Sequence, residues 1–91
     1  MKVLVRKPTI EQLQFMETCP IWEHATGTFP WEYKEKQETC LIISGKGYVQ
    51  GDDGNKFSFE RGDLVTFPKH WKCTWTIIED IKKYYAFDLE Y

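Results

Sequence analysis

The chain has 91 residues, with 16% aromatic side chains, 29% charged side chains and a formal net charge of −2. This length suits a single domain spanning residues 1–91, and the aromatic content is typical of a compact core built from large rings. The slightly acidic composition, without a basic stripe, argues against nucleic-acid binding. The longest aliphatic run, Leu41–Ile43, is too short to cross a membrane.

The three cysteines, Cys19, Cys40 and Cys73, indicate a reducing compartment. They are odd in number and widely spaced, so they predict neither a closed disulfide framework nor a Cys-x-x-Cys zinc pair. Reduced thiols and the lack of a secretion signal predict a cytoplasmic protein, or one of an organelle stroma if a transit peptide has been removed. Because so small a domain is marginally stable alone, we expect a homodimer.

The first twenty residues predict a short strand at 2–7 and then one helix over Thr9–Thr18. Thr9 is the candidate N-cap, and Gln12 three residues later completes a capping-box pattern. An apolar stripe at helical spacing gives this helix one face to bury, consisting of Ile10, Leu13 and Met16.

Beyond the helix the chain alternates and turns as antiparallel β-structure does. Residues 21–34 predict two strands about Gly27, and residues 38–51 predict a hairpin that turns at Gly45–Gly47. Asp53–Gly54 is a further strong turn signal. Strands recur about every eight to twelve residues, which is typical of a sandwich or barrel. The remaining predicted strands are 56–60, 64–68, 72–78 and 82–91.

Two stretches of this β-rich part carry a family pattern. In the first, Glu38 is followed by Gly45, with Glu-Thr-Cys at its start; in the second, Gly62 is followed after five residues by Pro68, in a Phe-Pro-Lys turn. Together they resemble the two motifs of the cupin superfamily over about residues 20–90, and most closely the small single-domain cupins grouped with ureidoglycine aminohydrolase. The resemblance implies an all-β double-stranded β-helix (an RmlC-like jelly-roll barrel) with one short N-terminal helix and a small-molecule site at the barrel mouth.

Cupins usually hold a metal at this mouth through two His and a Glu of the first motif and a His of the second. Carried over by the resemblance, only Glu38 of these four ligands is present. The two first-motif His positions fall on Trp31 and Tyr33, or on Glu32 and Lys34 if the gap is one residue shorter.

The second-motif His position falls on Cys73, and neither histidine of the chain, His24 or His70, falls at a ligand position. Trp has no lone pair to offer and a neutral Tyr is a poor ligand, whereas a catalytic metal site needs about three protein ligands. The resemblance therefore implies a degenerate metal site, and we predict neither a metal nor another cofactor.

Strand alternation predicts which side chains face the mouth. Glu38 and Tyr33 are the candidate catalytic pair, with Tyr33 the expected donor to the carboxylate. For the rings, filling the barrel core is the alternative to lining a pocket, and for Glu38 it is a structural hydrogen-bond anchor. The predicted ligand-binding residues are Trp31, Tyr33, Glu38, Cys40, Cys73 and Trp75.

Three functions are compatible with these residues. The first is a metal-independent cupin that binds a small polar, planar molecule around Glu38. The second is an enzyme that uses Glu38 and Tyr33 for acid/base chemistry, such as the ureido or amide hydrolysis or the isomerisation that the family resemblance implies. The third is a non-catalytic subunit of a larger assembly, such as a plastid one. The sequence leaves open whether the protein is an enzyme.

Overall fold

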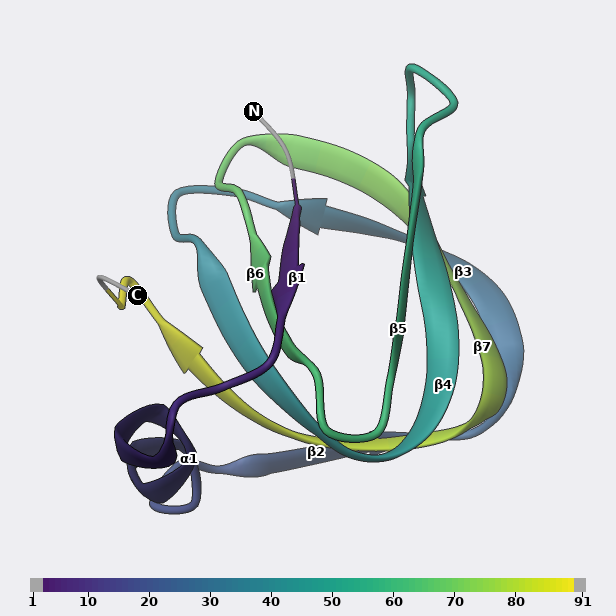
Figure 1. Ribbon diagram of the computed structural model, residues 1–91. Coiled ribbons are helices and arrows are strands. Elements are labelled where there is room, and N and C mark those ends of the chain that lie inside the picture. The colour runs from purple at the N-terminus through teal and green to yellow at the C-terminus, as the bar shows by residue number, and fades with distance from the viewer. Residues whose placement is uncertain (1–2, 90–91) are drawn as a thin grey trace.

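A computed structural model describes residues 3–89, which form a strongly curved antiparallel sheet closed into a barrel, with one short helix beside its open end (Figure 1). The ends of the first and last predicted strands, residues 2 and 90–91, lie outside the described residues. The all-β fold with a single N-terminal helix is confirmed. Among the described residues no helix has the length and apolar character needed to span a membrane.

Two long strands organise the sheet. Its seven strands follow the order β1-β6-β4-β7-β2, and in addition β3 pairs with β7 and β5 with β4. Every strand except β1 is therefore hydrogen-bonded to β4 or β7. The elements are β1 (Leu4–Arg6), α1 (Ile10–Met16), β2 (Ile21–His24), β3 (Gly27–Tyr33), β4 (Glu38–Gly51), β5 (Lys56–Glu60), β6 (Leu64–Phe67) and β7 (Trp71–Phe87).

Helix α1 begins as the sequence predicts, because Thr9 caps it and Gln12 completes the capping box. It is shorter than expected, and the predicted burial of its whole apolar stripe is wrong. Ile10 is 77% exposed, whereas Met16 is fully buried against Leu41 and Leu64. Only the last turn of this seven-residue helix reaches the sheet, so only that turn has a core to join.

The predicted turn at Gly45–Gly47 is wrong, because β4 continues through these residues as one strand. The two glycines instead mark bulges, where the pairing of β4 with β7 shifts register several times. Gly45 has φ of 91°, and a Cβ atom there would overlap the carbonyl oxygen of Asp80 on β7. Glycine thus permits a close approach of two backbones at the bend of the barrel. The predicted strands 72–78 and 82–91 are likewise one strand, β7.

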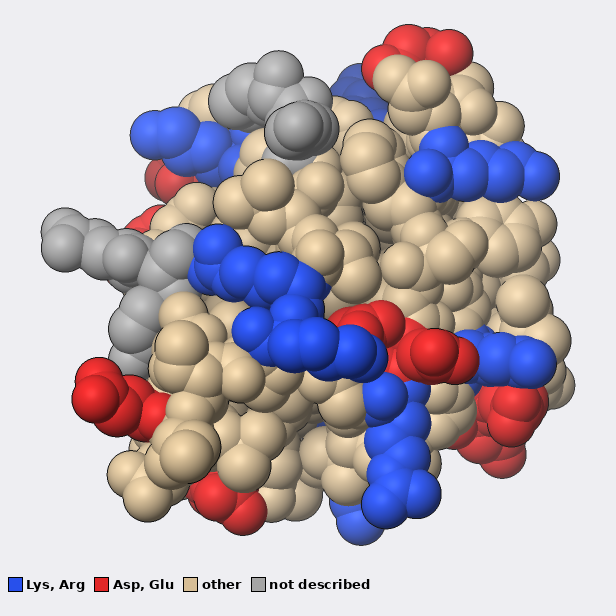
Figure 2. Space-filling view, in the orientation of Figure 1, with Lys and Arg blue, Asp and Glu red and all other residues tan. Residues whose placement is uncertain are grey.

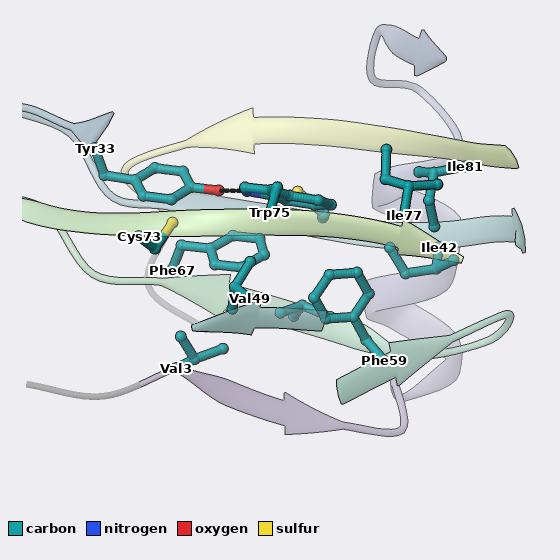
Figure 3. Close-up of a cluster of buried hydrophobic side chains, with 12 residues drawn as sticks. Val3, Tyr33, Ile42, Val49, Phe59, Phe67, Cys73, Trp75, Ile77 and Ile81 are labelled. Carbon is teal, nitrogen blue, oxygen red and sulfur yellow. Dashed lines mark hydrogen bonds between the residues drawn. The ribbon is translucent and has the colours of Figure 1, made fainter. Parts of the chain in front are cut away.

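Large rings fill one end of the barrel interior (Figure 3). Phe67 stacks on Tyr33 with ring centroids 4.9 Å apart, and Trp75 contacts both Phe59 and Phe67. Buried rings of this size each contribute a large apolar area, which helps to hold so small a sheet closed. Tyr33 and Trp75 also border a space beside these rings that side chains do not fill.

Candidate functional site

The space at the barrel mouth is a pocket of about 190 Å³ between β2, β3, β7 and the start of β4. Pockets for drug-sized ligands measure about 300–1,000 Å³, so this one suits a smaller molecule. Its walls are mostly aromatic, and its polar groups are a carboxylate, an ammonium and two phenols. The lining residues are Trp22, Phe29, Trp31, Tyr33, Glu38, Trp75, Lys83, Tyr85 and Phe87.

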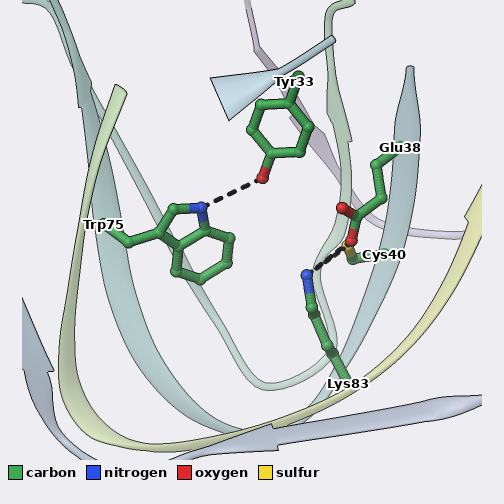
Figure 4. Close-up of polar contacts among 5 residues, drawn as sticks. All are labelled: Tyr33, Glu38, Cys40, Trp75 and Lys83. Carbon is green, nitrogen blue, oxygen red and sulfur yellow. Dashed lines mark hydrogen bonds and ion pairs between the residues drawn. The ribbon is translucent and has the colours of Figure 1, made fainter. Parts of the chain in front are cut away.

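A buried ion pair forms the polar wall of this pocket (Figure 4). Glu38 opens β4 and Lys83 lies on β7, with 6% and 5% of their surfaces exposed. The Lys83 Nζ atom donates to Glu38 Oε2 over 2.6 Å and to the Cys40 Sγ atom over 3.1 Å. The Cys40 thiol in turn donates to the same Oε2 over 2.7 Å. The carboxylate that heads this strand is therefore paired with a buried cation.

Aromatic faces surround the ammonium group of Lys83. Its Nζ atom lies 4.8 Å from the ring centroid of Trp22, 4.9 Å from that of Trp75 and 5.9 Å from that of Phe67. Burial alone would lower the pKa of Lys83, but Cys40 and Glu38 outweigh this effect and raise the pKa above its ordinary value. Lys83 thus stays charged, stabilised by the carboxylate and by cation–π attraction.

Tyr33 does not donate to Glu38, so that expectation is wrong. Its hydroxyl oxygen accepts a hydrogen bond from Trp75 Nε1 over 3.1 Å, and Glu38 Oε2 is already taken by Lys83 and Cys40. Burial raises the pKa of Tyr33 well above its usual value, and the charge of Glu38 adds to this. The phenol is therefore neutral and can act as a hydrogen-bond donor rather than as a base.

The two predicted cysteines have different positions. Cys40 lies behind the ion pair, and burial raises the pKa of its thiol well above the usual value. Cys73 lies opposite Trp31 in the strand register and lines no part of this pocket. Burial, with the nearby charge of Asp52, raises the pKa of Cys73 to about 12. Both side chains are protonated thiols, which are poor nucleophiles.

Of the predicted residues, the structure brings Trp31, Tyr33, Glu38 and Trp75 to the pocket and Cys40 beside it. Sequence reasoning missed Lys83. The signal was the alternation along β7. Lys83 shares its strand face with the buried residues Trp75, Ile77 and Ile81, and only Glu79 interrupts this pattern. The other residues missed are Trp22, Phe29, Tyr85 and Phe87.

The residues at the mouth do not fit the metal of the cupin superfamily. Among residues 3–89 no three His, Cys, Asp or Glu side chains cluster closely enough to hold an ion. Glu38 already faces an ammonium at 2.6 Å, and an ammonium has no lone pair to give to a metal. The positive charge that a metal would bring to this carboxylate is supplied here by Lys83.

The curved antiparallel barrel, the pocket at its mouth and the two motifs about Glu38–Gly45 and Gly62–Pro68 define a cupin. More specifically, the chain belongs to the EutQ-like cupin domain family, whose family model matches residues 11–85. No curated protein matches it.

Solved structures agree with this assignment. A DUF861 family protein from Thermotoga maritima is 43% identical, with a TM-score of 0.89, and the match covers 96% of this chain and 100% of that protein. The EutQ protein of Clostridium difficile is 24% identical with a TM-score of 0.68, covering 93% of this chain and 66% of that one. A putative ethanolamine utilization protein Q from Salmonella typhimurium is 17% identical with a TM-score of 0.65, covering 93% and 68%. The last two likenesses concern the fold alone.

Proposed function

We propose that this protein binds a small, flat, polar molecule at the barrel mouth without the help of a metal. The observation that carries the proposal is the buried Glu38–Lys83 ion pair in the wall of an aromatic pocket of about 190 Å³. Burying two charges is costly, and an apolar pair of the same size would stabilise the fold as well or better. A charge pair that nevertheless faces an open volume is typical of a site that orients a ligand.

The arrangement of the aromatic walls favours a ligand that is planar. Phe29 and Trp75 are parallel to within 6°, and Trp22 meets Trp75 edge-on at 6.0 Å. Flat molecules bury a large area against such rings while losing little conformational entropy. Trp31 and Phe87 are each about half exposed, at 47% and 48%, so two rings of the lining remain open to solvent.

The experiment is a fragment screen in which binding is monitored through the indole N–H signals of ¹⁵N-labelled protein. EDTA is present to remove metal ions. We expect a subset of planar fragments to shift the signals of Trp75 and Trp22, which line the pocket, and to leave that of Trp71, which does not. EDTA should not change their affinity. If no fragment at millimolar concentration moves the Trp75 or Trp22 signal, or if EDTA abolishes binding, the proposal is wrong.

An acid/base enzyme is the second candidate, supported by the neutral Tyr33 phenol in the same pocket as the Glu38 carboxylate. In this alternative Tyr33 is the general acid and Glu38 the base, in a ureido or amide hydrolysis or an isomerisation of the ureidoglycine aminohydrolase-like kind. It is the weaker candidate, because the carboxylate that would act as the base is held in a buried ion pair with Lys83 over 2.6 Å. Turnover of small ureides or amides that is lost in Tyr33→Phe would favour it.

The other readings have less support. Nothing in the described residues specifically favours a non-catalytic subunit of a larger assembly, and the open pocket argues for binding instead. Ethanolamine utilization belongs to the name of a 17% identical protein, which is too distant to transfer a role to this chain.

A further inference from the structure

We infer that the ligand of this pocket is a neutral planar lactam, that is, a flat ring in which an N–H group stands next to a carbonyl, bound through the N–H to Glu38 and through the carbonyl oxygen to Tyr33. The inference rests on the proposed function and names the chemical class that the same site would take. It is carried by two hydrogen-bonding functions in the pocket that the protein itself leaves unused.

The first unused function is an acceptor, the Oε1 atom of Glu38. Both hydrogen bonds to this carboxylate go to Oε2, and none from residues 3–89 reaches Oε1. In that part of the chain the only fully buried side-chain N or O atoms without a partner are Arg6 Nε and Nη2. Oε1 therefore keeps some accessible surface, and Glu38 is a lining residue of the pocket. A ligand N–H can bind there without displacing Lys83.

The second unused function is a donor, the hydroxyl hydrogen of Tyr33. The oxygen of this phenol accepts from Trp75, and within residues 3–89 its own O–H has no acceptor. The phenol is 4% exposed and is kept neutral by burial. Figure 4 shows the hydroxyl and the Glu38 carboxylate directed toward the same space. An acceptor and a donor that are directed toward one space match the N–H and C=O of one lactam edge.

The charge balance excludes ions. Glu38 and Lys83 neutralise each other, so an ionic ligand would add an uncompensated buried charge. A quaternary ammonium could otherwise use aromatic rings of this kind. Here that position is already held, since the Lys83 ammonium lies within 4.9 Å of the ring centroids of both Trp22 and Trp75. A neutral ligand is therefore the one that fits.

The test compares four small probes by calorimetry on the wild-type protein. They are 2-pyridone, N-methyl-2-pyridone, choline and benzoate, which are respectively a flat lactam, the same ring without its N–H, a cation and an anion. We expect 2-pyridone to bind at least tenfold more tightly than each of the other three. Tyr33→Phe should weaken 2-pyridone binding at least fivefold, whereas Tyr48→Phe, which lies outside the pocket, should not.

The outcomes separate the inference from the proposed function. If N-methyl-2-pyridone binds as tightly as 2-pyridone, the pocket takes flat molecules but the lactam assignment is wrong. Preference for choline or benzoate overturns the assignment in the same way. If none of the four binds while other fragments shift the Trp75 signal, only the inference fails; if no fragment does, the proposed function fails with it. The wild-type comparison holds even if Tyr33→Phe does not fold.

Discussion

Removing Lys83 tests whether the buried ion pair is organised as described. The Lys83→Met change keeps an unbranched apolar stem but leaves the Glu38 carboxylate, 6% exposed, without its cation. Removing one partner of a buried pair typically costs about 3–5 kcal/mol, a large part of the about 5–15 kcal/mol by which small domains are stable. The measurement is the free energy of unfolding from urea titrations followed by tryptophan fluorescence.

The matched control removes both charges. In the double variant Glu38→Gln/Lys83→Met no charge is buried alone, so we expect most of the lost stability to return, to within about 1 kcal/mol of wild type. The single change Glu38→Gln should be costly for the same reason as Lys83→Met. The reasoning is refuted if Lys83→Met costs less than about 1 kcal/mol, or if the double variant loses the sum of the two single losses.

The same variants give a dependence on pH. The folded-state pKa of Lys83 is raised, chiefly because Cys40 and Glu38 outweigh the opposing effect of burial. A group with a raised pKa binds its proton more tightly in the folded state, so its contribution is complete below the unfolded value of about 10.4. It is lost as the pH rises through the folded-state pKa. On the alkaline side, wild type should therefore begin to lose stability relative to the double variant above about pH 10.4.

Three further predictions follow from the burial, the backbone and the size of the chain. At pH 8 the native protein should react with one equivalent of DTNB through the half-buried Cys19, while Cys40 and Cys73 react only after unfolding; fast reaction of all three thiols would contradict the described burial. Gly45→Ala should destabilise the fold by more than about 2 kcal/mol, because the added Cβ atom adds overlap with the neighbouring strand to the backbone strain. Gly62 has the same φ of 91° but open space around it, so Gly62→Ala should cost only the backbone strain of about 1–2 kcal/mol. Equal losses of stability in the two variants would refute the close approach at Gly45. Since the core is small and β1 lies at the edge of the sheet, we propose a homodimer, and a sedimentation mass of one chain at micromolar concentration would count against it.

The fold was predictable because its signals are local or depend on spacing. Thr9 and Gln12 indicate the helix through the capping box that they form. Gly45, Gly62 and Pro68 of the two motifs indicate the cupin barrel. The error at Gly45 has a physical cause. Glycine marks both turns and close backbone approaches, and only the neighbouring strand, with Asp80 against Gly45, decides between them.

The site was predictable in part. Alternation places Tyr33, Glu38 and Trp75 on the inner face, but it cannot say which polar atoms meet. Lys83, the partner of Glu38, was missed because it directly follows another lysine, Lys82. Lysines normally face solvent, so two in a row do not indicate a buried cation. The buried carboxylate was nevertheless an indication that a cation was needed, since an unpaired one is very costly.

The connectivity of β7 has a consequence for how the protein is made. β2 and β3 pair with no other strand of the described sheet than β7, and β7 ends at Phe87. Until β7 has emerged from the ribosome, β2 and β3 have no strand to pair with. The pocket residues of β3 and β4 also lack Trp75 and Lys83, which β7 carries. Folding of this domain is therefore expected to wait for β7 and to be slow, because its pairings join segments far apart in sequence. During that interval the unpaired strands are candidates for chaperone binding or for aggregation.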